Sequence, residues 1–284
     1  MSSATPLPSY SSYEFMLVSS PSPFVAHVEI NRPKKLNAFT QDVWVEFSRV
    51  FRQISVDPEV RVVVLSGAGN RAFTAGLDVQ AASEGLITAQ ASDPARKAKL
   101  LREHIEEFQE SISAMEKCEK PVICVLHDIA IGLAIDIACC ADIRICASNV
   151  RLSVKEVDIG MAADIGTLAR LPKIVGSTSW VKDVCLSARD FSAEEALAVG
   201  FASQVHPDKA RAVEAAVGMA TALAEKSPIA VQGTKELLNY GREHGTADSL
   251  RYTAIWNAVA VQGADFSAAL QSGLKRTRPR FEKL

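Results

Sequence analysis

The chain has 284 residues, of which 48% are hydrophobic, 23% are charged and 6% are aromatic, a composition typical of a globular protein. Its formal net charge of −2 gives no electrostatic footprint for nucleic acid, so we expect no nucleic-acid partner. No apolar run approaches the about 20 residues that a membrane-spanning helix needs, so we also expect no membrane insertion.

The two ends of the chain and its six cysteines bear on compartment. Residues 1–23 are rich in serine and proline and carry no lysine or arginine, so we expect a flexible segment rather than a signal peptide or presequence. The final Glu-Lys-Leu is a weak match to the Ser-Lys-Leu peroxisomal address, so the peroxisome is expected, with mitochondrial or cytoplasmic placement as alternatives. The cysteines form no CxxC pair and have no histidine at metal-ligand spacing, which indicates buried, reduced thiols and no metal.

The first predicted elements are a strand, a helix and a second strand. Residues 24–30 alternate apolar and polar side chains, as a strand does. Apolar side chains at helical spacing predict a helix over 43–54, with Thr40 as its N-cap. The β-branched run over 60–65 is typical of a buried strand, and a parallel pair needs such a crossover.

The middle of the chain continues this alternation. Residues 71–78 are predicted as a loop, and 81–99 as a mobile helical or loop excursion. An amphipathic helix is expected over 97–117, followed by a buried strand over 122–126 and a turn over 127–132.

The rest of the chain is predicted to be mainly helical. Helices are expected over 133–141, 163–175, 177–186, 193–199, 207–225, 228–243, 246–262 and 265–274, and short strands over 143–147, 150–154 and 201–206. Strands that alternate with helices and are followed by a helical end predict an α/β core over 24–206 and a helical region over 207–284.

Three carboxylates stand in segments with the character of buried chain. Asp136 lies in IAIGLAIDIACC, and Glu156 and Asp164 lie in KEVDIGMAADIGTLAR. A buried, unpaired carboxylate is costly, so such groups are either paired or functional. Structural explanations stay open: Asp136 could pair with Arg144 or cap a helix, Glu156 could lie on the surface beside Lys155, and Asp164 could be a helix N-cap.

Two glycine-bearing loops follow predicted strands, TAGLD at 74–78 and HDIAIGLAID at 127–136. Loops at the carboxyl ends of parallel strands form ligand crevices, and glycine lets the backbone approach a ligand. One backbone N–H from each loop could converge on one oxygen and form an oxyanion hole. The sequence has no GxxxxGK[ST], GxSxG or HExxH motif, and His127 is interpreted as a histidine hydrogen-bonded to nearby backbone.

Taken together, these segments resemble the crotonase (enoyl-CoA hydratase/isomerase) superfamily. The similarity is carried by NRPKKLNAF, AFTAGLD, the stretch from KPVICVLH to CCADIRI, and VKEVDIGMAADIGTLARLPKIVG, and covers about residues 24–274. Within the superfamily, the Δ3,5-Δ2,4-dienoyl-CoA isomerases carry an Asp, then a Glu in KEVD, then an Asp in AADxGTL. Asp136, Glu156 and Asp164 match that pattern, with spacings of 20 and 8 residues.

The resemblance implies an α/β fold, a crotonase-like spiral of β–β–α turns, whose C-terminal α-helical region drives assembly into a trimer or a dimer of trimers. It implies an acyl-CoA thioester as substrate and no separate cofactor, because CoA is part of the substrate. The implied oxyanion-hole donors are the backbone N–H groups of Leu77 and Leu133. The implied substrate- or CoA-binding residues are Lys34, Leu36, Ala75, Gly76, Asp78 and Gly132.

The implied activity moves the double bonds of a 3,5-dienoyl-CoA to the 2,4 positions during fatty-acid β-oxidation. The C2 proton must leave and C6 must gain one, through a dienolate whose charge lies on the thioester oxygen. We expect Asp164 to be the C2 base, Glu156 the C6 acid, and Asp136 a supporting group. Neighbouring carboxylates repel one another, so at least one should hold a proton near neutral pH.

Two positions depart from the family pattern. The family usually has His-Gly at His127-Asp128 and three glycines at Gly132-Leu133-Ala134. The Leu133 side chain must therefore turn away from the thioester, and Asp128 is expected to add a charge near the site. Alternative functions are an enoyl-CoA hydratase, which uses two Glu residues on one water, a Δ3,Δ2-enoyl-CoA isomerase, or a crotonase-like binding or assembly protein without turnover.

Overall fold

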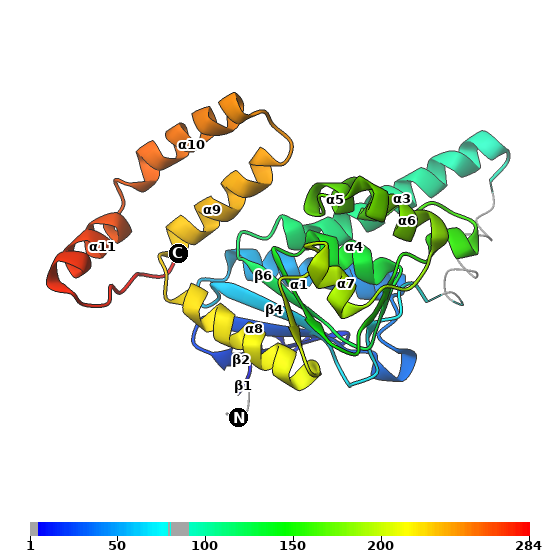
Figure 1. Ribbon diagram of the computed structural model, residues 1–284, viewed down its shortest axis with the longest axis horizontal. Helices are drawn as coiled ribbons and strands as arrows, with labels where there is room; N and C mark the ends of the chain where they lie inside the picture. The colour runs from blue at the N-terminus through cyan, green and yellow to red at the C-terminus, as the bar shows by residue number, and fades with distance from the viewer. Residues whose placement is uncertain (1–4, 79, 81–90) are drawn as a thin grey trace.

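The computed structural model describes residues 5–78, 80 and 91–284, and two sheets organise it (Figure 1). The larger sheet contains seven strands in the order β1-β2-β3-β4-β6-β8-β10, and the smaller contains three in the order β5-β7-β9. The strands of the larger sheet are β1 (Thr5–Pro6), β2 (Met16–Ser22), β3 (Val25–Ile30), β4 (Val62–Gly67), β6 (Val122–Leu126), β8 (Ile143–Ala147) and β10 (Gln204–His206). Those of the smaller sheet are β5 (Ala72–Thr74), β7 (Ile129–Ile131) and β9 (Arg151–Ser153).

The chain winds between the two sheets in repeated turns. β4 is followed by β5, β6 by β7, and β8 by β9, and in each pair the first strand joins the larger sheet and the second joins the smaller. The pairing of successive turns is parallel in both sheets. The helices that complete the turns are α3 (Pro94–Glu116), α4 (Leu133–Cys140), and then α5 (Thr167–Ile174), α6 (Thr178–Ser187) and α7 (Ala193–Ala198). This is the predicted spiral of β–β–α turns.

Both faces of the larger sheet are covered. The main core lies on one face, where α1 (Gln41–Val56), α3 and α4 pack. The other face is covered by α8 (Lys209–Ala224), which crosses the sheet in Figure 1. The residues of α8 that meet the sheet are Ala212, Ala216, Ala220 and Ala224, one on each turn, and their small side chains let the helix lie close to the valines of β4. The core therefore extends to the end of α8, past the boundary expected at residue 206.

The N-terminal segment is part of the sheet. β2 pairs antiparallel with β3, and the buried Tyr10 donates a hydrogen bond of 2.7 Å to Asp57. The expectation that residues 1–23 form a flexible segment is therefore wrong for 5–22. β2 lies at the edge of the strands from β3 to β10, and among the described residues only two of its residues pair with β1. Strands near a sheet edge tolerate the serines and proline that hid this one.

Several predicted boundaries also move. The loop expected over 71–78 contains β5, and the turn expected over 127–132 contains β7, since strands of three residues show no readable periodicity. α3 begins at Pro94, three residues before the helix expected from 97, with Asp93 as its N-cap. Of the excursion expected over 81–99, residues 81–90 lie outside the described residues. The helix expected from 163 begins at Thr167.

The C-terminal helices extend away from the sheets as an arm (Figure 1). The arm consists of α9 (Pro228–Gly241), α10 (Thr246–Ala260) and α11 (Ala264–Lys275). Large apolar side chains on it are exposed, among them Leu238 at 69%, Val259 at 72% and Leu274 at 87%. In the part of the chain that the structure describes, no helix has both the length and the apolar character to cross a membrane.

The contact between α8 and the sheet gives a stability prediction. Ala216 is completely buried against the sheet, so Ala216→Leu should overpack this contact and lower the free energy of unfolding by about 1–3 kcal/mol. Gly218 lies in the same helix with open space around a Cβ, so Gly218→Ala should raise it by about 0.5–1 kcal/mol. Urea unfolding of both variants checks the pair; equal effects would contradict the packing of α8.

Candidate active site

Two glycine loops come together between β5 and α4. Gly76 has φ +91° and Gly132 has φ +58°, conformations that L side chains rarely adopt. A Cβ placed on Gly76 would lie 3.0 Å from the carbonyl oxygen of Ile131 and 3.6 Å from the backbone nitrogen of Leu133. The absence of a side chain at Gly76 therefore lets the two backbones approach each other.

The N–H groups of Leu77 and Leu133 remain available in this arrangement. Leu77 forms a parallel bridge with Phe39, whose two bonds use the Gly76 carbonyl and the Asp78 N–H. The Leu77 N–H is left over from that bridge, and the Leu133 N–H belongs to the first turn of α4, where helices have no internal acceptor. Neither N–H has a hydrogen-bond partner among the described residues.

The segment expected to contact CoA lies along the first loop. Asn37 is fully buried, and its side-chain amide donates to the carbonyls of Ala68 and Ala72. Leu36 accepts a hydrogen bond of 2.9 Å from the N–H of Ala75, so it lies beside that loop. Lys34 is exposed one turn earlier, and Asp78 forms an ion pair of 3.4 Å with Arg32. The expected binding residues are thus brought together along one edge.

Asp136 is only 1% exposed in the first turn of α4 and caps a different helix. Its Oδ1 atom accepts hydrogen bonds from the N–H of Thr167, at 2.6 Å, and from the Thr167 hydroxyl, at 2.7 Å. α5 has Gly166 at its N-cap, which offers no side-chain acceptor, so Asp136 supplies it. Of the two structural explanations considered from sequence, helix capping is right; Arg144 instead donates to main-chain carbonyls.

Glu156 lies in the 3-10 helix η3 (Glu156–Ile159), close to the second glycine loop. A Cβ on Gly132 would lie 3.5 Å from its Oε1 atom, and its Oε2 atom is buried without a hydrogen-bond partner in the described part of the chain. Glu156 is therefore not the surface residue that the sequence left open. Glu156 therefore brings a carboxylate beside Gly132 with one oxygen whose hydrogen-bonding capacity the described chain leaves unused.

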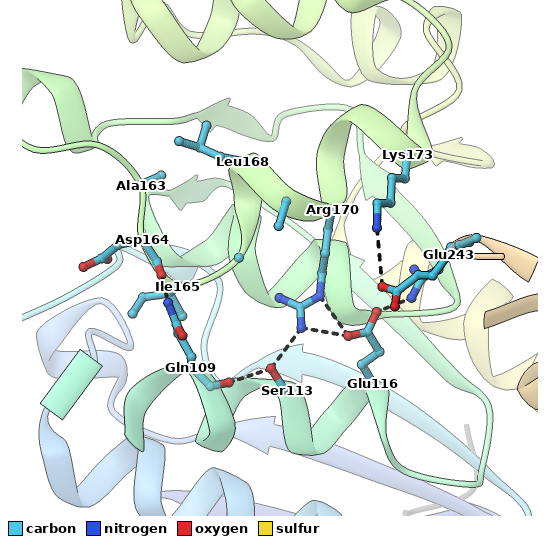
Figure 2. A pocket seen from close by; sticks show the side chains of 13 residues that line it. Gln109, Ser113, Glu116, Ala163, Asp164, Ile165, Leu168, Arg170, Lys173 and Glu243 are labelled. Carbon is cyan, nitrogen blue, oxygen red and sulfur yellow. Dashed lines mark hydrogen bonds and ion pairs between the residues drawn. The ribbon is translucent and has the colours of Figure 1, made fainter. Parts of the chain in front are cut away.

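Asp164 lies two residues before the N-cap of α5 and is half-buried. Its backbone carbonyl accepts a hydrogen bond of 2.5 Å from Nε2 of Gln109, which lies in α3. Figure 2 shows its carboxylate turned away from the side chain of Arg170. Asp164 is thus not the helix N-cap considered from sequence, and its carboxylate carries no capping role.

All three carboxylates have a raised pKa, and neighbouring carboxylates contribute to this at Asp136 and Glu156. Burial, then the charge of Glu156, raise the pKa of Asp136 to about 7, against the hydrogen bonds from Thr167. Burial, with the charge of Asp164, also raises the pKa of Glu156. Burial raises the pKa of Asp164, while the charge of His104 on α3 acts in the opposite direction. The expectation that the set holds a proton near neutral pH is supported by these directions.

The two departures from the family pattern have different outcomes. The Leu133 side chain is 4% exposed and belongs to the main core, so it is turned inward. Asp128 precedes β7, at the far end of that strand from Gly132, and interacts with Asn149 at 3.3 Å. Four residues of extended chain span about 13 Å, so the expectation of an added charge near the site is wrong. His127 is fully buried with neither ring nitrogen hydrogen-bonded to a described residue, and burial lowers its pKa to about 4.

Four residues that shape the site were not singled out from sequence: Asn37, Gln109, Thr167 and Arg170. Each acts through contacts with residues at least 31 positions away, so neighbouring sequence shows no pattern for them. Thr167 had one local signal, since it is the threonine of the GTL motif quoted above, which begins at Gly166. The six cysteines are all free and buried, as predicted.

A spiral of parallel strands that presents two free N–H groups beside three carboxylates defines an enzyme of the crotonase type. The sequence model for "Enoyl-CoA hydratase/isomerase" matches residues 22–283, and the chain belongs to this family.

Relatives and solved structures agree with that assignment. The chain is 43% identical to a mitochondrial Δ(3,5)-Δ(2,4)-dienoyl-CoA isomerase of Pongo abelii over 92% of this chain and 79% of that one. It is 38% identical to a peroxisomal Δ(3,5)-Δ(2,4)-dienoyl-CoA isomerase of Arabidopsis thaliana over 92% of this chain and 93% of that one. A crystal structure of a putative enoyl-CoA hydratase from Streptomyces coelicolor superposes with a TM-score of 0.86 at 27% identity, covering 99% of this chain and 98% of that one.

The raised pKa of Asp136 gives a prediction for stability against pH. Between about pH 4, the ordinary value in the unfolded chain, and pH 7, the folded protein keeps a proton that the unfolded chain releases, so rising pH destabilises the fold. Asp136→Asn keeps an acceptor for Thr167 but cannot ionise. Its stability relative to wild type should rise with pH in this window, by at most about 1.4 kcal/mol per pH unit.

Urea unfolding at several pH values measures this difference. Glu214→Gln removes a carboxylate that is 60% exposed on α8, across the larger sheet from α4, and controls for the loss of one negative charge. A difference between Asp136→Asn and wild type that does not change with pH would contradict the proton held by Asp136.

Proposed function

We propose that this protein is a Δ3,5-Δ2,4-dienoyl-CoA isomerase acting on acyl-CoA thioesters in fatty-acid β-oxidation. The observation that carries the proposal is the division of the three carboxylates. Asp136 is occupied by Thr167, whereas Glu156 keeps an unpartnered oxygen close to Gly132 and the Asp164 carboxylate points away from the neighbouring Arg170. The names of the relatives given above support the same activity.

The N–H groups of Leu77 and Leu133 would hold the thioester oxygen. Removal of the C2 proton places negative charge on that oxygen, and two fixed backbone donors stabilise the resulting dienolate. Each such donor is worth about 10²–10³ in rate. Both N–H groups are fixed by the glycine loops, so they need no rearrangement when the charge develops.

The geometry favours Glu156 as the C2 base and Asp164 as the C6 acid. C2 is bonded to the thioester carbon, so its base must lie beside the oxyanion hole, and Glu156 lies against Gly132 there. Asp164 precedes α5 and lies against α3, as needed for a group that acts further along the acyl chain. This order reverses the two roles that we expected from sequence.

In this scheme, no proton is gained or lost by the three carboxylates over a full cycle. Glu156 begins ionised and takes the C2 proton, while Asp164 begins protonated and gives its proton to C6. After one turnover, Glu156 is protonated and Asp164 is ionised, so a proton must return from one to the other. Asp136 interacts electrostatically with both and supports this exchange without contacting the reacting carbons.

The hydratase alternative fits this site less well. That reaction requires two carboxylates to activate one water, and Asp136 is shorter than the glutamate it would replace. Its Oδ1 atom also accepts two hydrogen bonds from Thr167, which fix it toward α5. Asp164 would then have no role in the chemistry.

We further propose that the protein is a homo-oligomer, a trimer or a dimer of trimers, assembled through the arm. The number of large apolar side chains exposed on α10 and α11 supports this proposal, because extensive exposed apolar surface is typical of a protein contact. These side chains include Leu250, Ile255, Val259, Phe266, Leu270 and Leu274. The relatives named above lie in two organelles, and we propose that this chain works in one of them, the peroxisome or the mitochondrion.

A substrate comparison tests the activity. Purified protein should convert a 3,5-dienoyl-CoA into a 2,4-dienoyl-CoA, seen as a rise in the absorbance of a diene conjugated with the thioester carbonyl. It should hydrate a 2-enoyl-CoA far more slowly. Rapid hydration of the 2-enoyl-CoA without a diene signal would instead identify a hydratase. No turnover of any CoA thioester would favour the binding or assembly protein.

Two variants separate the acid from the base. Glu156→Gln and Asp164→Asn should each lower diene formation by about 10²–10⁴-fold. Glu156→Gln should also abolish exchange of the C2 hydrogen with deuterated water, whereas Asp164→Asn should retain that exchange. The opposite pattern of exchange would restore the order expected from sequence, and unchanged turnover in both variants would exclude their catalytic roles.

A further inference from the structure

An ion network lies behind the Asp164 loop and has no part in the chemistry described so far (Figure 2). Arg170 of α5 donates from Nε to Glu116 of α3 at 2.9 Å, and from Nη2 to the hydroxyl of Ser113 at 2.9 Å. Glu116 also pairs with Arg242, the C-cap of α9. The network borders a cavity of about 330 Å³ that Asp164 also lines.

The guanidinium of Arg170 packs directly under the loop that carries Asp164. A Cβ on Gly166 would overlap Nη1 of Arg170, so the glycine is what lets the guanidinium reach this position. Gly166 has φ +155° and is the N-cap of α5. Asp164 lies two residues earlier, so the position of its backbone depends on where α5 begins.

Two anchors therefore hold the start of α5. Asp136 binds Thr167 from the side of α4, and the pair of Arg170 with Glu116 binds the helix from the side of α3. Gln109 of α3 adds a hydrogen bond to the carbonyl of Asp164 itself. The α3 anchor contacts the loop that carries Asp164 but not the segment that carries Glu156.

We propose that Arg170 and Glu116 are positioning residues that hold Asp164 in place for proton delivery at C6. The proposal rests on the proposed function, since it takes Asp164 as the C6 acid. Through Arg242, the same ion network connects this loop to α9, the first helix of the arm. The position of the arm and the position of Asp164 are thus linked through the Glu116 carboxylate.

The network is strong enough to act as a clamp. The side chains of Arg170 and Glu116 are only 16% and 18% exposed, so solvent screens their attraction weakly. Burial opposes the ionisation of Glu116, yet the hydrogen bonds from Arg170 and Arg242 outweigh it and lower the pKa of Glu116. The carboxylate is thus charged throughout the working range of pH, and it holds two guanidinium groups at once.

Replacement of Arg170 should separate the two proton transfers. Arg170→Met should lower diene formation by about 10–100-fold, since a displacement of about 1 Å costs roughly 10²-fold in rate. Exchange of the C2 hydrogen should stay within about 3-fold of wild type, because Glu156 and the two N–H groups are held by other contacts. The KM for substrate should change little, so the loss should fall on kcat.

Lys173→Met is the matched control. Lys173 lies in the same helix, one turn further on, and pairs with Glu243 at 3.4 Å, but the two side chains are 44% and 63% exposed. This variant should leave both rates unchanged. Arg170→Lys keeps the charge but loses the planar fork whose separate nitrogens bind Glu116 and Ser113, so its diene rate should lie between those of Arg170→Met and wild type.

If Arg170 only stabilised the fold, diene formation and C2 exchange would fall together in Arg170→Met. That result would overturn the proposal. If Arg170→Met does not fold, Arg170→Lys keeps a positive charge beside Glu116 and leaves the pair of Glu116 with Arg242 intact, and it should show the same separation of rates at smaller amplitude. Asp164→Asn distinguishes the levels of failure. If it leaves diene formation intact, the proposed function of Asp164 fails; if it blocks diene formation but Arg170→Met behaves as wild type, only the positioning role fails.

Discussion

The hydrogen bonds between Asp136 and Thr167 join the two halves of the site. Asp136 lies in the first turn of α4, three residues after Leu133. Thr167 begins α5, three residues after Asp164. In the proposed mechanism, one carboxylate would therefore fix the distance between the N–H group that holds the oxyanion and the acid that acts at the other end of the diene. Neither α4 nor α5 has a capping side chain of its own, so no local contact replaces this one.

The same interaction explains why the site tolerates three carboxylates. Burial raises the pKa of all three, and neighbouring carboxylates raise it further at Asp136 and Glu156. Asp136 is compensated by two donors, both on its Oδ1 atom. Glu156 keeps an oxygen without a partner in the described chain, and the Asp164 carboxylate points away from the cations of the neighbouring network. The repulsion that remains keeps a proton on the set near neutral pH, which an acid and a base working as partners require.

Arg170 lies behind the loop rather than beside the carboxylates. It can therefore hold the loop in place without favouring the ionised form of Asp164. A cation in contact with Asp164 would hold it ionised and remove the proton it must deliver. Arg170 instead forms an ion pair with Glu116 and approaches the loop of Asp164 only at the backbone of Gly166. The connection to Arg242 brings the arm into the same network, so the proposed assembly through the arm and the geometry of the site would share one carboxylate.

The sequence by itself determined the repeating pattern of strands and helices, the three carboxylates and the two glycine loops, because periodicity, burial of charge and short motifs are local properties. It missed β2, β5 and β7, whose pairing depends on strands elsewhere in the chain. Only the tertiary structure decided that Asp136 caps α5 and that Glu156 rather than Asp164 lies beside Gly132. It also decided that Arg170 packs against the loop that carries Asp164 and Gly166. These are contacts across more than 20 residues of chain, and no spacing rule in a single sequence encodes which of several nearby carboxylates ends next to which donor.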